Sequence, residues 1–273
     1  MNEKIRIDRP FSYYSQERYS EASVSCVAIF YMIMKVAVVS RYKEDIVPVL
    51  EQCGVEISDK SPDAVIAYGG DGTFLSSERA FPGLPKLPLR DSRTGPLCAA
   101  HNIRNLVERF ASGKLEKSEL IKINGFFMNK KITALNDIFI HNYNRNRAIR
   151  SSVWIDDELY LKEDMNDGIG IATPHGSTAY FRNITNCIFR SGIGLAFSNS
   201  RDHSTHIVVP EYSVIRIKVT RGPVVVVYDN ADETDRLEPG EEISVRKSDK
   251  SLVVYGLKDF MCQSCRALRH TKI

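Results

Sequence analysis

The sequence predicts an N-terminal α/β domain with a parallel sheet, followed by a mostly β domain. Two observations support this prediction. From residue 34 to about 117, apolar runs alternate with amphipathic stretches, which is typical of a parallel sheet covered by helices. From about 118 to 256, short alternating runs are separated by turn residues, which is typical of antiparallel strands.

The predicted elements of the first domain follow one another closely. Lys35 opens an apolar β-branched run, and Gly54 is a stop signal for the helix that follows, although Pro48 interrupts its pattern. Apolar residues fall on one side of the last helix, at Ile103 and Phe110 among others. In order, we expect a strand at 35–39, a helix at 42–52, a strand at 63–68, a helix at 73–80, a strand at 86–89 and a helix at 102–112.

The second domain is expected to contain ten β-rich runs and one helical stretch at 177–189. The runs are 119–123, 125–128, 132–141, 151–161, 168–172, 207–209, 213–220, 223–228, 242–247 and 251–255. Residues 257–273 are expected to form a tail. Cys262 and Cys265, with His270, resemble half of a zinc site, but a single C-x-x-C favours thiols in that tail.

Composition narrows the classes of protein. Of the 273 residues, 43% are hydrophobic and 26% charged, which excludes a disordered, collagen-like or coiled-coil chain. A net charge of +3 does not by itself indicate a nucleic-acid partner, and none is expected. The six cysteines are scattered, which favours reduced thiols in a cytoplasmic protein.

Residues 1–33 are expected to form an extension outside the fold. The apolar run from Ala22 to Met34 has thirteen residues, too few to span a bilayer, so no membrane association is expected. A membrane-associating leader is the alternative.

The turn Gly69–Thr73 follows a buried strand and opens a helix. Gly70 and Gly72 let a ligand approach the backbone. The helix is expected to begin at Thr73, and backbone amide groups at a helix N-terminus bind phosphate well. Asp71 would then accept a hydrogen bond from an attacking hydroxyl or hold Mg²⁺ against phosphates. The structural alternative is a tight turn in which the aspartate caps the helix.

Two further segments carry polar groups suited to a nucleotide. In Asp167–Tyr180, an apolar strand ends in a turn, after which Ser177 and Thr178 open a helix; an ordinary strand–turn–helix corner is the alternative. Asn136–Asp137 precedes an apolar strand and could bind ribose hydroxyls, although a β-bulge or turn explains it equally well. Three arginines follow that strand, of which Arg147 is our choice for contacting phosphate. A solvated basic loop is the alternative.

Other nucleotide-binding and hydrolase signatures are absent. No segment matches G-x-x-x-x-G-K-[ST] or G-x-G-x-x-G, which disfavours P-loop NTPases and simple dinucleotide oxidoreductases. No G-x-S-x-G elbow is present.

The three segments Gly69–Leu75, Asn136–Asp137 and Asp167–Tyr180 occur in the order and rough spacing of the NAD kinases, and the chain resembles that family from about residue 34 to 256. The closing run Leu237–Val245 is similar to the family's last strands. Diacylglycerol and sphingosine kinases share the glycine turn alone. The pattern Thr-Pro-x-Gly-Ser-Thr-Ala-Tyr is much more specific to NAD kinases.

The resemblance implies a Rossmann-like α/β domain and a β domain with the active site between them. The expected reaction converts NAD and ATP to NADP and ADP with Mg²⁺ or another divalent cation, and Asp71 would receive the proton of the adenosine 2′-hydroxyl. A homodimer or homotetramer is expected, with no metal ligands in the chain itself. The residues expected to bind the nucleotides are Gly70, Gly72, Thr73, Asn136, Asp137, Arg147, Asp167, His175, Ser177, Thr178, Ala179 and Tyr180.

The chain departs from the family at four places. His175 replaces a small hydroxylated residue, and Phe181–Thr185 replaces small residues leading to a Gly-Gly. Residues 89–95 replace an Asn-x-Gly-x-x-Gly loop, and Asp229–Ala231 replaces Asp-Gly-Gln. These changes leave open a lipid or sugar kinase, or a non-catalytic nucleotide-binding module on the same fold. They also leave open the donor: ATP, another triphosphate or polyphosphate.

Overall fold

The computed structural model describes residues 34–91, 93, 102–202 and 204–265. The expected extension over 1–33, together with its alternative as a leader, lies outside the described residues, as does His270. The residues that the structure describes belong to one compact unit. Among them, no helix is long and apolar enough to cross a membrane.

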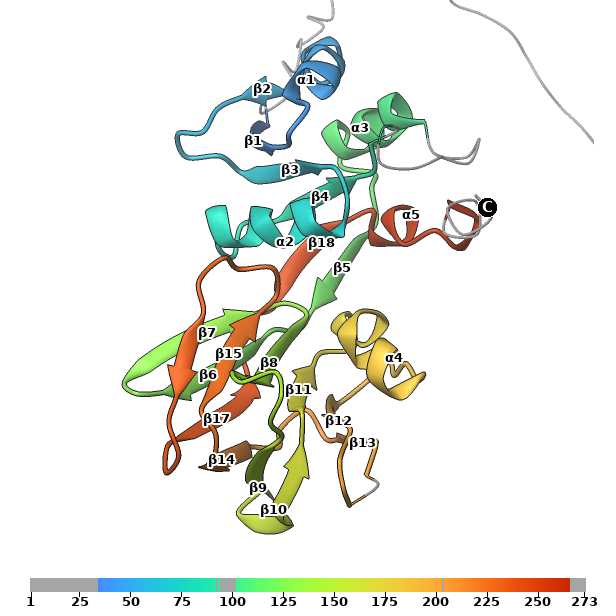
Figure 1. Ribbon diagram of the computed structural model, residues 1–273. Coiled ribbons are helices and arrows are strands. Elements are labelled where there is room, and N and C mark those ends of the chain that lie inside the picture. Colours follow the sequence, from blue (N-terminus) through green and yellow to red (C-terminus); the bar gives the residue numbers. More distant parts are fainter. Residues whose placement is uncertain (1–33, 92, 94–101, 203, 266–273) are drawn as a thin grey trace, which may run out of the picture. The chain divides into compact units, whose positions relative to one another are not determined.

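The first sheet is the parallel sheet that the sequence predicts (Figure 1). Within it, β3 is buried along its whole length, as expected of a strand covered on both faces. The strands, in spatial order, are β2 (Glu56–Ile57), β1 (Lys35–Val39), β3 (Ala64–Tyr68), β4 (Lys86–Leu89), β18 (Leu252–Tyr255) and β5 (Lys117–Leu120). All neighbours are parallel except the last pair, β18 and β5.

The helices of this half are α1 (Lys43–Gln52), α2 (Asp71–Ala80), α3 (Ile103–Ala111) and α5 (Leu257–Phe260). In α3, Leu106, Val107 and Phe110 are buried, and the side chain of Asn102 accepts a hydrogen bond from the Asn105 N–H at the helix start. These residues join a core formed with the strands, so the amphipathic pattern of the sequence is confirmed.

The second half is a β-sandwich of two antiparallel sheets. Apolar side chains of both sheets, such as Ile217 and Ile140, meet in one buried core. One sheet has the order β10 (Glu158–Asn166), β9 (Ile149–Ile155), β14 (Ile215–Arg221), β17 (Glu242–Lys247), β6 (Ile123–Phe127) and β7 (Lys130–Ala134). The other has the order β13 (His206–Val209), β12 (Ile193–Ser198), β11 (Gly168–Ala172), β8 (Asp137–Asn142), β15 (Val224–Tyr228) and β16 (Asp235–Leu237).

The domain limits read from the sequence, 34–117 and 118–256, stay a prediction. Strand pairing crosses them, because β18 lies between β4 and β5 in the first sheet. Residues 251–255 were expected in the β domain. Their place in the parallel sheet brings the end of the chain back beside β4.

Several sequence-predicted elements differ from those observed. The helical stretch expected at 177–189 is a 3-10 turn, η1 (Gly176–Thr178), followed by the short helix α4 (Tyr180–Thr185). Asn186 adopts a left-handed conformation with φ of 55°, which ends the helix. The runs 132–141 and 151–161 each contain a turn between two strands, and β12 and β16 were not expected at all.

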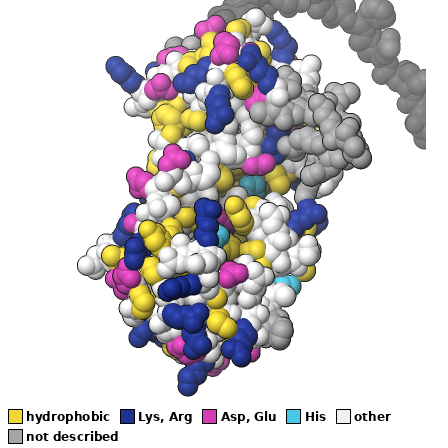
Figure 2. Space-filling view, in the orientation of Figure 1, with side chains coloured by type: hydrophobic (Ala, Val, Ile, Leu, Met, Phe, Trp, Pro, Cys, Tyr) yellow, Lys and Arg dark blue, Asp and Glu magenta, His cyan; other side chains and the backbone are white. Residues whose placement is uncertain are grey.

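Acidic and basic side chains are interspersed over the face that Figure 2 shows, in keeping with the small net charge. No large region of a single sign dominates this face.

Candidate functional site

Two of the predicted polar segments meet because β8 and β11 are antiparallel neighbours. Their register pairs Ala172 with Asp137, so the end of β11 lies beside the start of β8. The Thr173 N–H donates to the Asn136 carbonyl at 2.8 Å, and the Thr173 hydroxyl donates to the Leu135 carbonyl at 2.7 Å. Thr173 is fully buried. The two segments are therefore fixed to each other by backbone and hydroxyl hydrogen bonds.

Gly176 makes the contact between these segments possible. A Cβ atom at this position would overlap with the backbone of Asn136. Only glycine permits this approach, because any side chain would force the two chain segments apart. The Gly176 N–H also donates to the Thr173 hydroxyl at 3.1 Å, which closes the turn.

Asp229, which follows β15, supports the same corner. Its carboxylate accepts hydrogen bonds from the N–H groups of Leu135 at 2.9 Å and Asn136 at 2.7 Å. Burial raises the pKa of Asp229, whereas these backbone hydrogen bonds lower it. Burial, with the nearby charge of Asp229, also raises the pKa of Asp137 to about 7. The corner thus places two carboxyl groups close together beneath Asn136.

The glycine turn connects β3 to α2 at the carboxyl edge of the parallel sheet, where ligands bind in open α/β folds. The Gly69 N–H donates to the Leu89 carbonyl at 2.8 Å, which ties the turn to the end of β4. Gly70 occupies the cap position, and Asp71 is the first helical residue. Its carboxylate pairs with Arg90, with one nitrogen–oxygen distance of 2.9 Å, so Asp71 does not serve as the helix cap.

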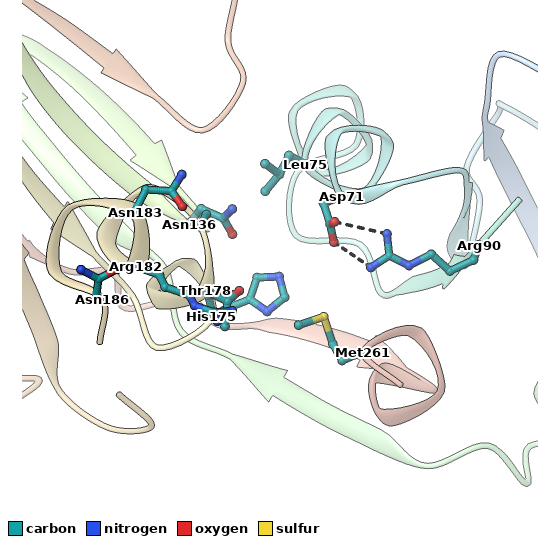
Figure 3. A pocket seen from close by; sticks show the side chains of 11 residues that line it. Asp71, Leu75, Arg90, Asn136, His175, Thr178, Arg182, Asn183, Asn186 and Met261 are labelled. Carbon is teal, nitrogen blue, oxygen red and sulfur yellow. Dashed lines mark hydrogen bonds and ion pairs between the residues drawn. The ribbon is translucent and has the colours of Figure 1, made fainter. Parts of the chain in front are cut away.

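A cavity of about 830 Å³ lies between this turn and the corner of the β domain. Figure 3 shows Asp71 and Arg90 on one side, with Asn136, His175 and Thr178 across from them. The cavity is lined by Asp71, Leu75, Arg90, Asn136, His175, Thr178, Ala179, Arg182, Asn183, Asn186 and Met261. The structure therefore brings Asp71, Asn136 and the Thr-Pro-His-Gly-Ser-Thr turn to one space.

Two groups in this cavity have unusual surroundings. The side-chain oxygen of Asn136 is buried and has no hydrogen-bond partner among the described residues. A buried polar atom of this kind is normally satisfied, so it marks a place for a ligand or water. Burial lowers the pKa of His175, with Asp71 raising it and Arg90 lowering it further, and its ring meets Phe74 edge-on at 5.7 Å.

A second cavity, of about 410 Å³, lies on the other side of the glycine turn. It is lined by Gly70, Gly72 and Thr73 together with Tyr68, Asn230 and residues of the β1–α1 connection. The turn therefore separates two spaces, with the Asp71 side chain in one and the backbone of its glycine neighbours in the other.

Other predicted site residues do not line the larger cavity. Ser177 is buried, and its hydroxyl donates to the Pro174 carbonyl at 2.7 Å, which is a structural use. Tyr180 is 58% exposed, with the ring of Phe139 6.0 Å away. Asp137 is buried behind Asn136.

Asp167 and Arg147 lie furthest from the cavity. Asp167 precedes β11, roughly 20 Å along the strand from Thr173, and accepts a hydrogen bond from Asn199 at 2.7 Å. Arg147 follows the far end of β8, where its carbonyl accepts a hydrogen bond from Asn142 at 3.2 Å. Their roles in nucleotide binding stay predictions.

Six residues that line the cavity were not predicted as site residues: Leu75, Arg90, Arg182, Asn183, Asn186 and Met261. For Arg90 a signal existed, because it directly follows a parallel strand at the edge where ligands bind. Arg182, Asn183 and Asn186 fall in the segment that departs from the family pattern. Met261 follows α5 and reaches the site only because β18 returns to the first sheet.

No group of three or more His, Cys, Asp or Glu suited to a metal ion is found within the described ranges. Cys265 is 2% exposed and Cys262 is partly buried, so this segment packs against the fold.

Comparison with known proteins agrees with this two-part architecture. The fold is similar to a yeast NADH kinase complexed with NADH, with a TM-score of 0.71 and 19% identity, covering 85% of this chain and 87% of that one. It is also similar to an NAD kinase from Archaeoglobus fulgidus in complex with ATP, with a TM-score of 0.69 and 20% identity, covering 85% and 97%. The chain therefore has the two-lobed fold of these structures, an α/β lobe and a β lobe, with the larger cavity between them.

Sequence comparison identifies the family. Residues 135–257 match the model of the ATP-NAD kinase C-terminal domain. An NAD kinase of Caldicellulosiruptor saccharolyticus is 31% identical over 217 residues, which cover 75% of this chain and 82% of the relative. One from Methanothermobacter thermautotrophicus is 26% identical over 225 residues, covering 78% of each chain. The chain belongs to the NAD kinase family.

Proposed function

We propose that this protein transfers the terminal phosphoryl group of ATP to the 2′-hydroxyl of the adenosine ribose of NAD, giving NADP and ADP. The observation that carries the proposal is one cavity of about 830 Å³ that contains the Asp71 carboxylate and, across from it, Asn136 and Thr178. A dinucleotide held by Asn136 and Thr178 would present a ribose hydroxyl to the Asp71 carboxylate.

Each residue would then have a defined role. Asn136 would direct its otherwise unpartnered oxygen to a ribose hydroxyl. Thr178 and Ala179 would contact the adenosine, and His175 would lie beside it as a neutral ring, because burial lowers its pKa. Asp71 would orient the attacking hydroxyl and accept its proton as the new oxygen–phosphorus bond forms.

The donor would bind through the glycine turn. Gly70 and Gly72 line the second cavity at the N-terminus of α2, where backbone N–H groups favour phosphate. Asp71 lines the larger cavity, and its sequence neighbours Gly70 and Gly72 line the second, so a phosphoryl group held at the turn would lie next to an acceptor in the larger cavity.

A divalent cation such as Mg²⁺ fits this site as part of the bound donor. Mg²⁺ is usually held by one or two carboxylates, water and substrate phosphates. The donor phosphates and water would supply its ligands here, because the Asp71 carboxylate is paired with Arg90 and, in the proposed mechanism, faces the acceptor hydroxyl. When bound, such a cation neutralises phosphate charge.

The test is a product assay for NADP with ATP, other triphosphates and polyphosphate offered in parallel. NADP formation with ATP supports the proposal. NAD binding by calorimetry without NADP from any donor would instead indicate a non-catalytic binding module. Phosphorylation of a lipid or sugar without NAD binding would indicate the other kinase class.

We further propose a homodimer or homotetramer that acts in the cytoplasm. Large apolar side chains such as Tyr212, at 82% exposure, and Met128, at 61%, are ones that an interface between copies would cover. Light scattering on the purified protein measures the oligomeric state.

A further inference from the structure

Arg90 is held in the wall of the larger cavity by three kinds of contact. Its Nη1 and Nη2 atoms donate to the two oxygens of Asp71, at 3.2 and 2.9 Å. Its Nε donates to the Phe260 carbonyl at 3.3 Å. Its guanidinium carbon lies 3.7 Å from the centre of the Phe260 ring. The guanidinium is therefore fixed in position and orientation before any substrate binds.

The two partners of this ion pair differ in their exposure. The Arg90 side chain is 10% exposed, whereas that of Asp71 is 61% exposed. Arg90 is anchored by α5 and the end of β4, but the Asp71 carboxylate has room to turn. Asp71 is thus the partner that another anion can replace at the Arg90 guanidinium.

The position of Arg90 follows from that of Asp71. If Asp71 accepts the proton of the attacking hydroxyl, the phosphoryl group being transferred lies next to that hydroxyl. A guanidinium within hydrogen-bond distance of Asp71 then faces the phosphoryl oxygens once the Asp71 side chain turns away. A planar fork that binds a carboxylate bidentately binds phosphate in the same way.

We propose that Arg90 binds the terminal phosphate of the phosphoryl donor, exchanging Asp71 for phosphate oxygens and so releasing the carboxylate to face the acceptor hydroxyl. The inference rests on the proposed function, because it assumes that Asp71 faces the acceptor. Arg90 is then a catalytic residue that this chain carries where NAD kinases usually have an Asn-x-Gly loop.

The chemical step balances with these groups. The acceptor oxygen forms a bond to the terminal phosphorus, and the bond from that phosphorus to the bridging oxygen breaks, leaving ADP. The hydroxyl proton passes to Asp71. Arg90 transfers no proton; it neutralises charge on the moving phosphoryl group and holds its orientation.

The test measures binding rather than turnover, using calorimetry with ADP and with the non-hydrolysable ATP analogue that carries an imido bridge. Arg90→Met should weaken the ATP analogue by about 10- to 100-fold, the loss expected for charge-assisted hydrogen bonds. Binding of ADP, which lacks the terminal phosphate, should weaken by less than about 3-fold in the same variant. Equal weakening of both ligands, or of neither, overturns the proposal.

Arg216→Met is the matched control. Arg216 also lies over an aromatic ring, 4.4 Å from Trp154, and pairs with Glu242 at 3.6 Å, but it lies in the β-sandwich outside both cavities. The Arg216→Met substitution should change neither the affinity for the ATP analogue nor that for ADP. If Arg90→Met does not fold, Arg90→Lys carries the test, because lysine keeps the charge and loses the fork; retained full discrimination between ATP analogue and ADP overturns the proposal.

A double-mutant cycle separates exchange from simple charge repulsion. If Asp71 competes with phosphate for Arg90, Asp71→Asn strengthens binding of the ATP analogue more in the presence of Arg90 than in the Arg90→Met background. Equal strengthening in both backgrounds contradicts exchange. These binding measurements do not depend on NADP formation, so they test Arg90 even if the protein forms no NADP. If the protein forms NADP and Arg90→Met is unimpaired, this inference fails while the proposed function stands.

Discussion

The side-chain amide of Asn230 donates a hydrogen bond to the Gly72 carbonyl across 3.0 Å. Asn230 follows β15 in the β-sandwich, whereas Gly72 lies in the first turn of α2. The Asn230 oxygen accepts a hydrogen bond from Arg79, also on α2. One asparagine thus connects the glycine turn to the segment after β15, whose Asp229 supports the corner that holds Asn136.

Substitution of Asn230 should affect geometry more than folding. Because Asn230 is exposed, Asn230→Ala should lower the free energy of unfolding by less than about 1 kcal/mol. The glycine turn and the Asn136 corner should be held less well in their relative position, so kcat/KM for NAD should fall by about 3- to 10-fold. Steady-state kinetics and denaturant titration measure the two effects. A large stability loss with unchanged kinetics would contradict this role.

Removal of the Asp71 carboxylate should abolish most of the turnover. Asp71→Asn is expected to lower kcat by about 10²- to 10⁴-fold, because the amide cannot accept the hydroxyl proton. The affinity for NAD should change little, since the proposed NAD contacts, Asn136 and Thr178, lie on the opposite side of the cavity. Single-turnover kinetics with calorimetry for NAD provide the measurement. Unchanged turnover would remove Asp71 from the mechanism.

The contact of Gly176 with Asn136 should make this glycine intolerant of any side chain. A Cβ here would overlap with the Asn136 backbone, so Gly176→Ala should lower the free energy of unfolding by about 1–3 kcal/mol or more and weaken NAD binding. Gly72→Ala is the comparison for stability. A Cβ at Gly72 meets its nearest atom, of Asn230, at 3.5 Å, and alanine favours the helix. Equal losses for both variants would contradict this account.

The pKa of Asp137 gives stability a defined dependence on pH. Its value of about 7 in the folded protein exceeds the ordinary 3.8, so the folded state holds the proton more tightly than the unfolded state. This stabilisation is complete below about pH 4 and is lost as pH rises to about 7.

In Asp137→Asn the side chain stays neutral at every pH. As pH rises from about 4 to about 7, the unfolding free energy of the variant should therefore increase relative to that of the wild type. The slope is up to about 1.4 kcal/mol per pH unit. Asp229 remains in both proteins, so the difference between the two curves reports the titration of Asp137 together with its coupling to Asp229. Denaturant titration at several pH values measures it, and parallel curves would refute the assignment.

The parallel sheet and its helices could be predicted from sequence because their signals are local. Continuous apolar runs such as Ala64–Tyr68 and the stripe of α3 need no knowledge of distant contacts. The place of β18 could not be predicted, because an apolar strand carries no mark of which sheet it joins. The end of α4 was missed because Asn186 replaces glycine as the left-handed stop.

The motifs predicted which backbone corners meet at the cavity, while the binding roles of their residues stay predictions. Asp71, Asn136 and Thr178 line one cavity, as their pattern suggested. Arg90 had a local signal, its place after a parallel strand, but its anchoring by Phe260 could not be predicted, because Phe260 lies 170 positions further along the chain. Ser177 illustrates the opposite case: a motif hydroxyl that could bind a ligand is used within the fold by the Pro174 carbonyl.

The return of β18 to the parallel sheet means that the polypeptide passes between the two lobes twice, once on leaving β5 and once on entering β18. A fragment ending near residue 117 would expose the β4 edge and lack the Phe260 ring under Arg90. The N-terminal lobe is therefore not a separable module, and a truncation that removes β18 and α5 also removes part of the wall of the site.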